Sequence, residues 1–202
     1  MEILTPISTQ NSCSTHLSPH PSHSPAEFST GADVVYALHG HYRISSIEVR
    51  EFDHKSVKFY KLETQKRKHP RASANDHAIW IPVSSAKERG LRYPMTTKDV
   101  EEVFRILETK ESLFELDESW LSIHERLETC IYAEGAIGLA KVYSYLCFLK
   151  RKQIVPPTVI ARFLETVEKA LLREISITLE QPLRIIEERI QKTLRQKSTS
   201  NN

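Results

Sequence analysis

The sequence is poor in glycine, with five in 202 residues, and it has no glycine-rich loop of the kind that binds phosphates at the start of a helix. It also contains no Cys-x-x-Cys pair and no His-Glu-x-x-His motif. These absences argue against nucleotide-dependent and zinc-dependent enzymes. His39 and His41 lie near one predicted turn, but no nucleophile accompanies them. We therefore expect a binding protein without catalytic residues, a cofactor or a metal.

Cysteine is scarce, and long apolar runs are missing. Cys13, Cys130 and Cys147 are odd in number and widely spaced, which predicts no disulfide framework and favours a reducing compartment. No apolar run approaches twenty residues, and the sequence does not begin with a basic segment followed by an apolar one. We expect neither secretion nor membrane insertion, and place the protein in the cytoplasm.

The charge is unevenly distributed along the chain. Residues 28–94 hold twelve Lys and Arg against seven Asp and Glu, a net charge of +5. Residues 95–202 hold sixteen against seventeen, a net charge of −1. A nucleic-acid-binding domain usually has a basic face, so the second region is less basic than such a function requires on average.

Four regions follow from composition and periodicity. Residues 1–27 are rich in Ser, Thr and Pro and are predicted to be a disordered tail. Residues 28–94 have strand-like patterns, and residues 95–196 have helical ones. Residues 197–202 form a second predicted disordered tail. The expected fold class is α+β, with a small β domain followed by a compact all-α bundle of about five helices.

Short strands fill the β region. Residues 34–36 are β-branched and aromatic, and the apolar pattern resumes at Ile44 after a turn in which Gly40 provides backbone freedom. Further strands are predicted around residues 58–62 and 79–83. A flat sheet of so few short strands cannot bury its own apolar side chains. A curled or closed sheet is therefore needed. Between the last two strands, residues 63–78 form a basic insertion, either a solvated loop or a mobile finger for polyanions.

The helical region begins with a capping signal, Thr96 followed three residues later by Asp99. Ser119 or Asp117 caps the second helix, and Pro157 and Pro182 begin later ones. Apolar residues recur at helical spacing through each segment. They are Val100, Val103, Phe104, Leu107, Trp120, Ile123, Leu127, Ile131, Leu139, Val142, Tyr143, Leu146, Ile160, Phe163, Leu164, Val167, Leu171, Ile175, Leu179, Leu183, Ile186, Ile190 and Leu194.

An ordered set of short motifs resembles the CarD family of bacterial transcription regulators, and also the polymerase-interacting domain of the transcription-repair coupling factor. The resemblance implies a Tudor-like (SH3-like) β-barrel that binds the β subunit of RNA polymerase. It also implies a helical domain that contacts promoter DNA at the upstream edge of the bubble, in a monomer that stabilises the open complex. The motifs are Phe28-x-x-Gly31, Asp33-Val34-Val35-Tyr36, His39-Gly40, Ile47-Glu48, Ile81-Pro82 and Gly90-Leu91-Arg92.

The resemblance also implies particular contact residues. Arg50 lies where the family carries an arginine that contacts the polymerase, and Arg suits paired contacts with carboxylates. Trp80 precedes Ile81-Pro82, where family members carry an arginine. If Ile79 and Ile81 face inward, alternation turns Trp80 outward, toward a partner. The alternative is a Trp80 packed inside the barrel.

Trp120 occupies the place of the family's tryptophan that wedges into the DNA minor groove. A flat aromatic group beside an unstacked step slows re-annealing, and nearby cations must hold the phosphates. The alternative is a Trp120 simply buried with Ile123 and Leu127. The residues available for the phosphates are Arg126, Lys150, Arg151, Lys152 and Arg162.

Two other binding functions remain open. In one, the chain is a protein-only adaptor of RNA polymerase, and the near-neutral helical domain binds another protein in place of DNA. In the other, it is a Tudor-type reader of methyl-lysine, with a cage formed by Tyr36, Tyr42, Phe59 and Tyr60.

Overall fold

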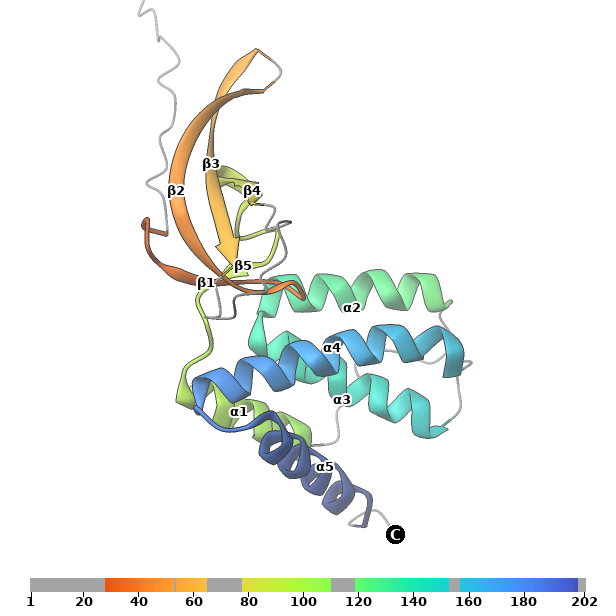
Figure 1. Ribbon diagram of the computed structural model, residues 1–202. Helices are drawn as coiled ribbons and strands as arrows, with labels where there is room; N and C mark the ends of the chain where they lie inside the picture. The colour runs from red at the N-terminus through yellow and green to blue at the C-terminus, as the bar shows by residue number, and fades with distance from the viewer. Residues whose placement is uncertain (1–27, 53, 65–77, 110–118, 153–156, 200–202) are drawn as a thin grey trace, which may run out of the picture.

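The computed structural model describes residues 28–52, 54–64, 78–109, 119–152 and 157–199 (Figure 1). Within these residues five strands come first and five helices follow, so the predicted α+β class is confirmed. The tail 1–27, most of the insertion (65–77) and residues 110–118 lie outside the described part, and the predictions for them stay predictions. The strands are β1 (Asp33–Tyr36), β2 (Gly40–Phe52), β3 (Lys55–Thr64), β4 (Ile79–Pro82) and β5 (Leu91–Arg92), with a short 3-10 helix (Val83–Ser85) after β4.

The strands form one antiparallel sheet in the order β4-β3-β2-β1-β5. The long β2–β3 hairpin dominates it and curves strongly (Figure 1), and the register shifts between Ile44 and Ser46. Such a bulge bends a strand and increases its twist. Among the described strands β4 and β5 are the two edges and do not pair with each other, so the sheet is curved but open.

One face of the sheet carries its apolar core. Ile44, Tyr60, Leu62 and Ile81 are almost fully buried there. Phe28, which precedes β1, packs on the same cluster, and its backbone N–H donates to the Tyr60 hydroxyl at 3.2 Å. Successive side chains of a strand point to opposite faces of the sheet. On β2, β3 and β4, the residues that alternate with these core residues therefore lie on the other face.

The helices are α1 (Thr97–Glu108), α2 (Trp120–Glu134), α3 (Ala136–Lys152), α4 (Pro157–Thr178) and α5 (Leu183–Thr199). Thr96 and Asp99 form the predicted capping box, and the Ser119 hydroxyl caps α2 by accepting from the Ser122 N–H. Most of the apolar positions predicted at helical spacing are buried in the bundle core. Trp120, Phe163 and Leu179 are only half-buried, and Leu183, the first residue of α5, is 47% exposed. α5 continues to Thr199, three residues beyond the predicted boundary at residue 196.

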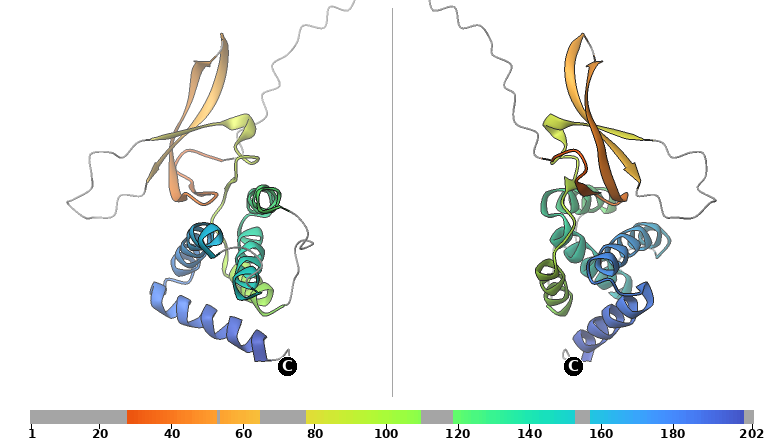
Figure 2. Two further views of the ribbon diagram at one scale, coloured as in Figure 1. Left: turned by 90° about the vertical axis from the view of Figure 1, so that its right-hand side faces the viewer. Right: turned by 60° about the vertical axis from the view of Figure 1, so that its left-hand side comes forward.

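One end of the sheet rests on the helical bundle (Figure 2). Leu38, in the turn between β1 and β2, packs against the core of the helices. Arg92, at the end of β5, donates from both terminal nitrogens to the two carboxylate oxygens of Glu174 on α4, at 2.5 and 2.6 Å. The Glu174 side chain is 3% exposed, and it also accepts from the Met95 N–H at 3.0 Å. These contacts hold the sheet and the helices in one arrangement.

Candidate functional site

Strands β2, β3 and β4 bring Arg50 and Trp80 together on the face of the sheet opposite its core. The Cζ atom of Arg50 lies 3.2 Å from the centroid of the Trp80 ring. Ile79 and Ile81 pack with the sheet core, so the predicted outward register of Trp80 is confirmed, and the alternative of a Trp80 packed between them is wrong. The strand pairing places Glu48, Phe59 and Lys61 on the same face of the sheet as Arg50 and Trp80. We call these five residues the Arg50–Trp80 surface.

The charges on this surface are only partly matched. The Glu48 carboxylate lies 3.6 Å from a terminal nitrogen of Arg50, with side-chain exposures of 42% and 47%. Lys61 lies opposite Trp80 in the register, and its ammonium is 5.9 Å from the Trp80 ring centroid. The hydrogen bond to Glu63 at 2.8 Å, together with that carboxylate's charge, raises the pKa of Lys61. The Lys61 ammonium is therefore charged at neutral pH.

The arrangement suits a protein partner that carries a carboxylate. Stacking on the indole orients the guanidinium without using its N–H groups, which remain able to pair a carboxylate bidentately. Trp80 and Phe59 are both half-buried and leave aromatic area for a partner to cover. A partly exposed tryptophan beside an arginine is the composition found where interface binding energy is concentrated.

At the other candidate site, Trp120 is the first residue of α2 and is half-buried. Its ring contacts that of His124 with 5.8 Å between centroids, and His124 contacts Phe163 of α4 at 4.5 Å. Ile123 and Leu127 are 3% and 0% exposed, so Trp120 lies at the margin of the core and keeps part of its ring accessible. Leu121, the next residue, is 71% exposed.

Most of the predicted phosphate-binding residues share that end of the bundle. Because Gly135 alone separates α2 from α3, the start of α2 and the end of α3 lie at the same end, where α4 also begins (Figure 1). Lys150, Arg151 and Lys152 finish α3, and Arg162 precedes Phe163; all four are exposed. We call Trp120 with these four residues the Trp120 end.

Arg126 is exposed but lies elsewhere on α2. It follows Trp120 by six positions, which places it about 120° around the helix from Trp120. Glu125 and Glu128 accompany it on α2, and Glu128 approaches His124 at 4.0 Å. The structure therefore groups five of the six residues predicted to contact DNA and separates Arg126 from them.

The four aromatic residues of the methyl-lysine hypothesis do not form one cage. Tyr60 is 0% exposed in the sheet core and Tyr42 is buried there too. Phe59 faces the opposite side, since consecutive strand residues alternate. Tyr36 stacks on His39, with ring centroids 4.6 Å apart. This prediction is wrong because it counted aromatic residues without assigning them to faces of the sheet.

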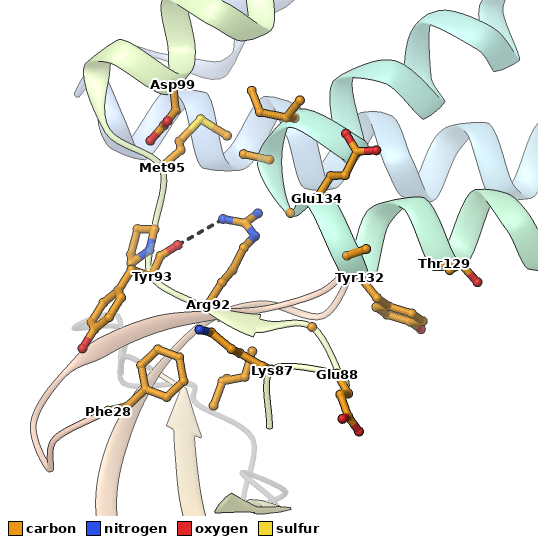
Figure 3. A pocket seen from close by; sticks show the side chains of 17 residues that line it. Phe28, Lys87, Glu88, Arg92, Tyr93, Met95, Asp99, Thr129, Tyr132 and Glu134 are labelled. Carbon is orange, nitrogen blue, oxygen red and sulfur yellow. Dashed lines mark hydrogen bonds between the residues drawn. The ribbon is translucent and has the colours of Figure 1, made fainter. Parts of the chain in front are cut away.

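A hollow of about 760 Å³ lies between the sheet and the bundle (Figure 3). It contains none of the predicted contact residues. Arg92 projects toward it and donates to the Tyr93 carbonyl at 3.2 Å. The two parts approach closely here: a Cβ on Gly90 would lie 2.8 Å from the Tyr132 ring, and one on Gly135 would lie 2.7 Å from Arg92 Cδ. The hollow thus follows the junction between the two parts.

Sequence reasoning missed the partners of the predicted residues. Phe59 and Lys61 join the Arg50–Trp80 surface only through strand register, which the sequence does not display. His124 could have been found, because it follows Trp120 by four positions and so lies on the same side of α2. Phe163 comes from another helix and has no such signal.

In the described part of the chain, no helix combines the length and the hydrophobicity that crossing a membrane requires. Within the same residues no three His, Cys, Asp or Glu side chains gather in a way that could hold a metal ion.

Comparison of the sequence with protein-family models and with curated proteins finds no match to either.

Proposed function

We propose that this chain is a transcription regulator of the CarD type, which binds the β subunit of RNA polymerase and stabilises the promoter open complex. The observation that carries the proposal is the stacking of Arg50 on Trp80, at 3.2 Å, on the non-core face of the sheet. These are the two positions for which the motif resemblance implies polymerase contacts. In this proposal the curved sheet acts as the Tudor-like domain, and Arg50 pairs with a carboxylate of the β subunit while Trp80 is covered.

The Trp120 end is the proposed DNA contact. The accessible part of the Trp120 ring inserts beside an unstacked base step at the upstream edge of the bubble and slows re-annealing. Lys150, Arg151, Lys152 and Arg162 are the cations that hold the adjacent phosphates, which offsets the few kcal/mol that unstacking costs. Arg126, on another side of α2, can reach only DNA that continues past the wedge.

The junction between the two parts supports this division of roles. The ion pair between Arg92 and Glu174 and the packing of Leu38 against the helical core hold the sheet against the helices. A polymerase-bound sheet would therefore hold Trp120 at a set distance from the β subunit. Restricting the wedge to one place raises its effective concentration at the DNA, so weak DNA affinity is sufficient. The proposal involves a cytoplasmic monomer and no catalytic step or cofactor.

A protein-only adaptor is the second candidate, favoured by one observation. Residues 95–202 carry a net charge of −1, and Glu125 and Glu128 accompany Arg126 on α2. These carboxylates oppose DNA phosphates but suit a basic protein partner. In this version the Trp120 end binds a second protein, while the Arg50–Trp80 surface still binds the polymerase.

Open-complex lifetime tests the proposal. The intact chain should bind purified RNA polymerase and slow the decay of heparin-challenged open complexes, and its DNA affinity should fall steeply with salt. Polymerase binding without any change in lifetime would favour the adaptor. Failure to bind the polymerase or its isolated β subunit would overturn both versions.

A further inference from the structure

A second cavity, of about 630 Å³, lies between the turn that joins β1 to β2 and the adjoining side of α4. Its lining comes from residues 37–42 on the sheet side, and from α4 between Thr166 and Ile177 on the helical side. It contains none of the residues of the Arg50–Trp80 surface or the Trp120 end. A volume of this size is typical of small-molecule sites, which fall in the range of roughly 300–1,000 Å³.

The charged residues of this cavity are predominantly basic. Lys169 and Arg173 lie one turn apart on α4, so both project from the same side of the helix. Lys169 pairs with Glu165, but both side chains are 61% exposed, and such surface pairs are weak and exchangeable. Arg173 has no hydrogen bond or ion pair with any described residue. The carboxylate that lines the cavity, Glu174, is already neutralised by Arg92.

His41 adds a buried polar atom without a partner. Its Nε2 is inaccessible and has no hydrogen-bond partner among the described residues. Burial is the main cause that holds the pKa of His41 below its ordinary value, the Arg92 charge acting in the same direction, while Glu174 and Asp33 act against them. The imidazole is thus neutral at physiological pH, with one N–H donor and one acceptor. An unsatisfied buried polar atom of this kind is costly, so His41 is an unfavourable position in the lining of the empty cavity.

The rest of the lining is apolar. Leu38 and Ala170 line the cavity from opposite sides, and Ile177 and Leu183 line it while remaining about half exposed. A ligand that fits must therefore combine an anionic group for the cations with an uncharged, flat or apolar part. A long polyanion would match the cations but leave this apolar lining unused.

We propose that the cavity binds a small phosphorylated ligand of the nucleotide class. Lys169 and Arg173 hold the phosphates, the imidazole of His41 lines the same cavity, and Leu38, Ile177 and Leu183 cover the base. Because the lining comes from both parts of the chain, a bound ligand also stabilises the junction between the sheet and the helices.

The test uses the purified intact chain with ADP, inorganic pyrophosphate and adenosine as probes. ADP should raise the melting temperature in a concentration-dependent manner, and should bind more tightly than pyrophosphate or adenosine. In nuclear magnetic resonance titrations, ADP should raise the pKa of the His41 imidazole, because a nearby phosphate favours its charged form. These readouts do not involve RNA polymerase, so they are independent of the proposed function.

Arg173→Gln should weaken ADP binding about tenfold or more, as expected for the loss of a charge-assisted hydrogen bond. Lys192→Gln is the matched control, because this substitution also removes one positive charge. Lys192 is exposed on α5 and lies outside the cavity. The proposal is overturned if both variants weaken binding equally, or if ADP leaves the His41 pKa and the melting temperature unchanged. It is also overturned if duplex DNA displaces ADP from the wild-type chain and depends on Arg173 to the same degree.

Discussion

The guanidinium carbon of Arg50 lies 3.2 Å from the centroid of the Trp80 ring, although the two residues are thirty positions apart in the sequence. Each side chain restricts the other: the indole orients the guanidinium, and the guanidinium covers part of the indole. A partner that binds here meets one preorganised unit. The effects of the two residues on binding should therefore be coupled.

Arg50→Glu should weaken binding to a purified β-subunit fragment by on the order of 2 kcal/mol or more, because a charge pair becomes a repulsion. Trp80→Ala should also weaken binding, and the double variant should lose less than the sum of the two single losses. Calorimetric titration of the three variants against the same fragment measures this coupling.

Lys58→Glu is the matched control for Arg50→Glu. Lys58 lies on the same hairpin and pairs with Val49, whereas Arg50 pairs with Val57, so Lys58 projects from the opposite face. Lys58→Glu changes the charge by the same amount as Arg50→Glu and should leave binding to the β-subunit fragment unchanged. Full binding by both Arg50→Glu and Trp80→Ala would remove this surface from the polymerase interface.

Trp120→Ala should shorten the lifetime of open promoter complexes by roughly tenfold, which corresponds to ~1.4 kcal/mol of lost stabilisation. The variant should stay folded, because Trp120 lies at the margin of the core and is only half-buried. Circular dichroism checks the fold, and the decay of complexes after a heparin challenge measures the lifetime.

Ile185→Ala is a suitable control, since Ile185 is a large apolar side chain, 50% exposed, on α5. It should leave the lifetime unchanged. If complexes with Trp120→Ala decay as slowly as those with the unaltered chain, Trp120 is no wedge and the adaptor function is favoured.

Glu174→Gln should lower the free energy of unfolding by about 3 kcal/mol, because the Arg92 guanidinium, whose side chain is 20% exposed, loses its counter-charge. Glu165→Gln on the same helix breaks an exposed pair with Lys169 and should have little effect. Urea unfolding measures both. Equal losses in the two variants would show that the buried pair does not hold the junction.

The free energy of unfolding should decrease as the pH is lowered below neutrality, partly because of His41. Burial holds its pKa in the folded chain below the ordinary value of 6.5. As the pH falls through 6.5, the unfolded chain takes up the proton before the folded chain does, so the folded state loses stability until its own imidazole is protonated.

Urea midpoints at about pH 7.5 and about pH 5.5 measure the size of this loss. The loss should be smaller in His41→Asn than in the unaltered chain. His54→Asn should keep the full loss, since His54 is exposed in the β2–β3 turn with a φ of 57°, a conformation that Asn tolerates. The same pH dependence in His41→Asn and in the unaltered chain would contradict the assignment.

Local pattern was enough to predict the helices, their capping box and the outward register of Trp80. Each depends on residues within a turn or two along the chain, where helical or strand periodicity acts directly. The stacking of Arg50 on Trp80 was not predictable, because it also requires the pairing of β3 with both neighbours and the register shift after Ile44.

Longer-range features were beyond the sequence for a similar reason. Arg92 and Glu174 are 82 positions apart, and nothing near either residue indicates the other. The near-neutral charge of residues 95–202 also concealed a local concentration of cations. Lys150, Arg151 and Lys152 share one end of the bundle with Arg162 because α3 ends there and α4 begins there.

The way Leu38 and Arg92 engage the helices bears on how the two parts can be separated experimentally. A chain cut after residue 94 would expose Leu38, which packs on the helical core, and would leave Arg92 without its counter-ion. The helical fragment would retain a Glu174 carboxylate that is 3% exposed in the intact chain and has no cation to neutralise it. Separately expressed fragments would thus expose an apolar side chain and unpaired charges that the intact chain covers. Point substitutions in the intact chain are therefore the better way to assign activities to each part.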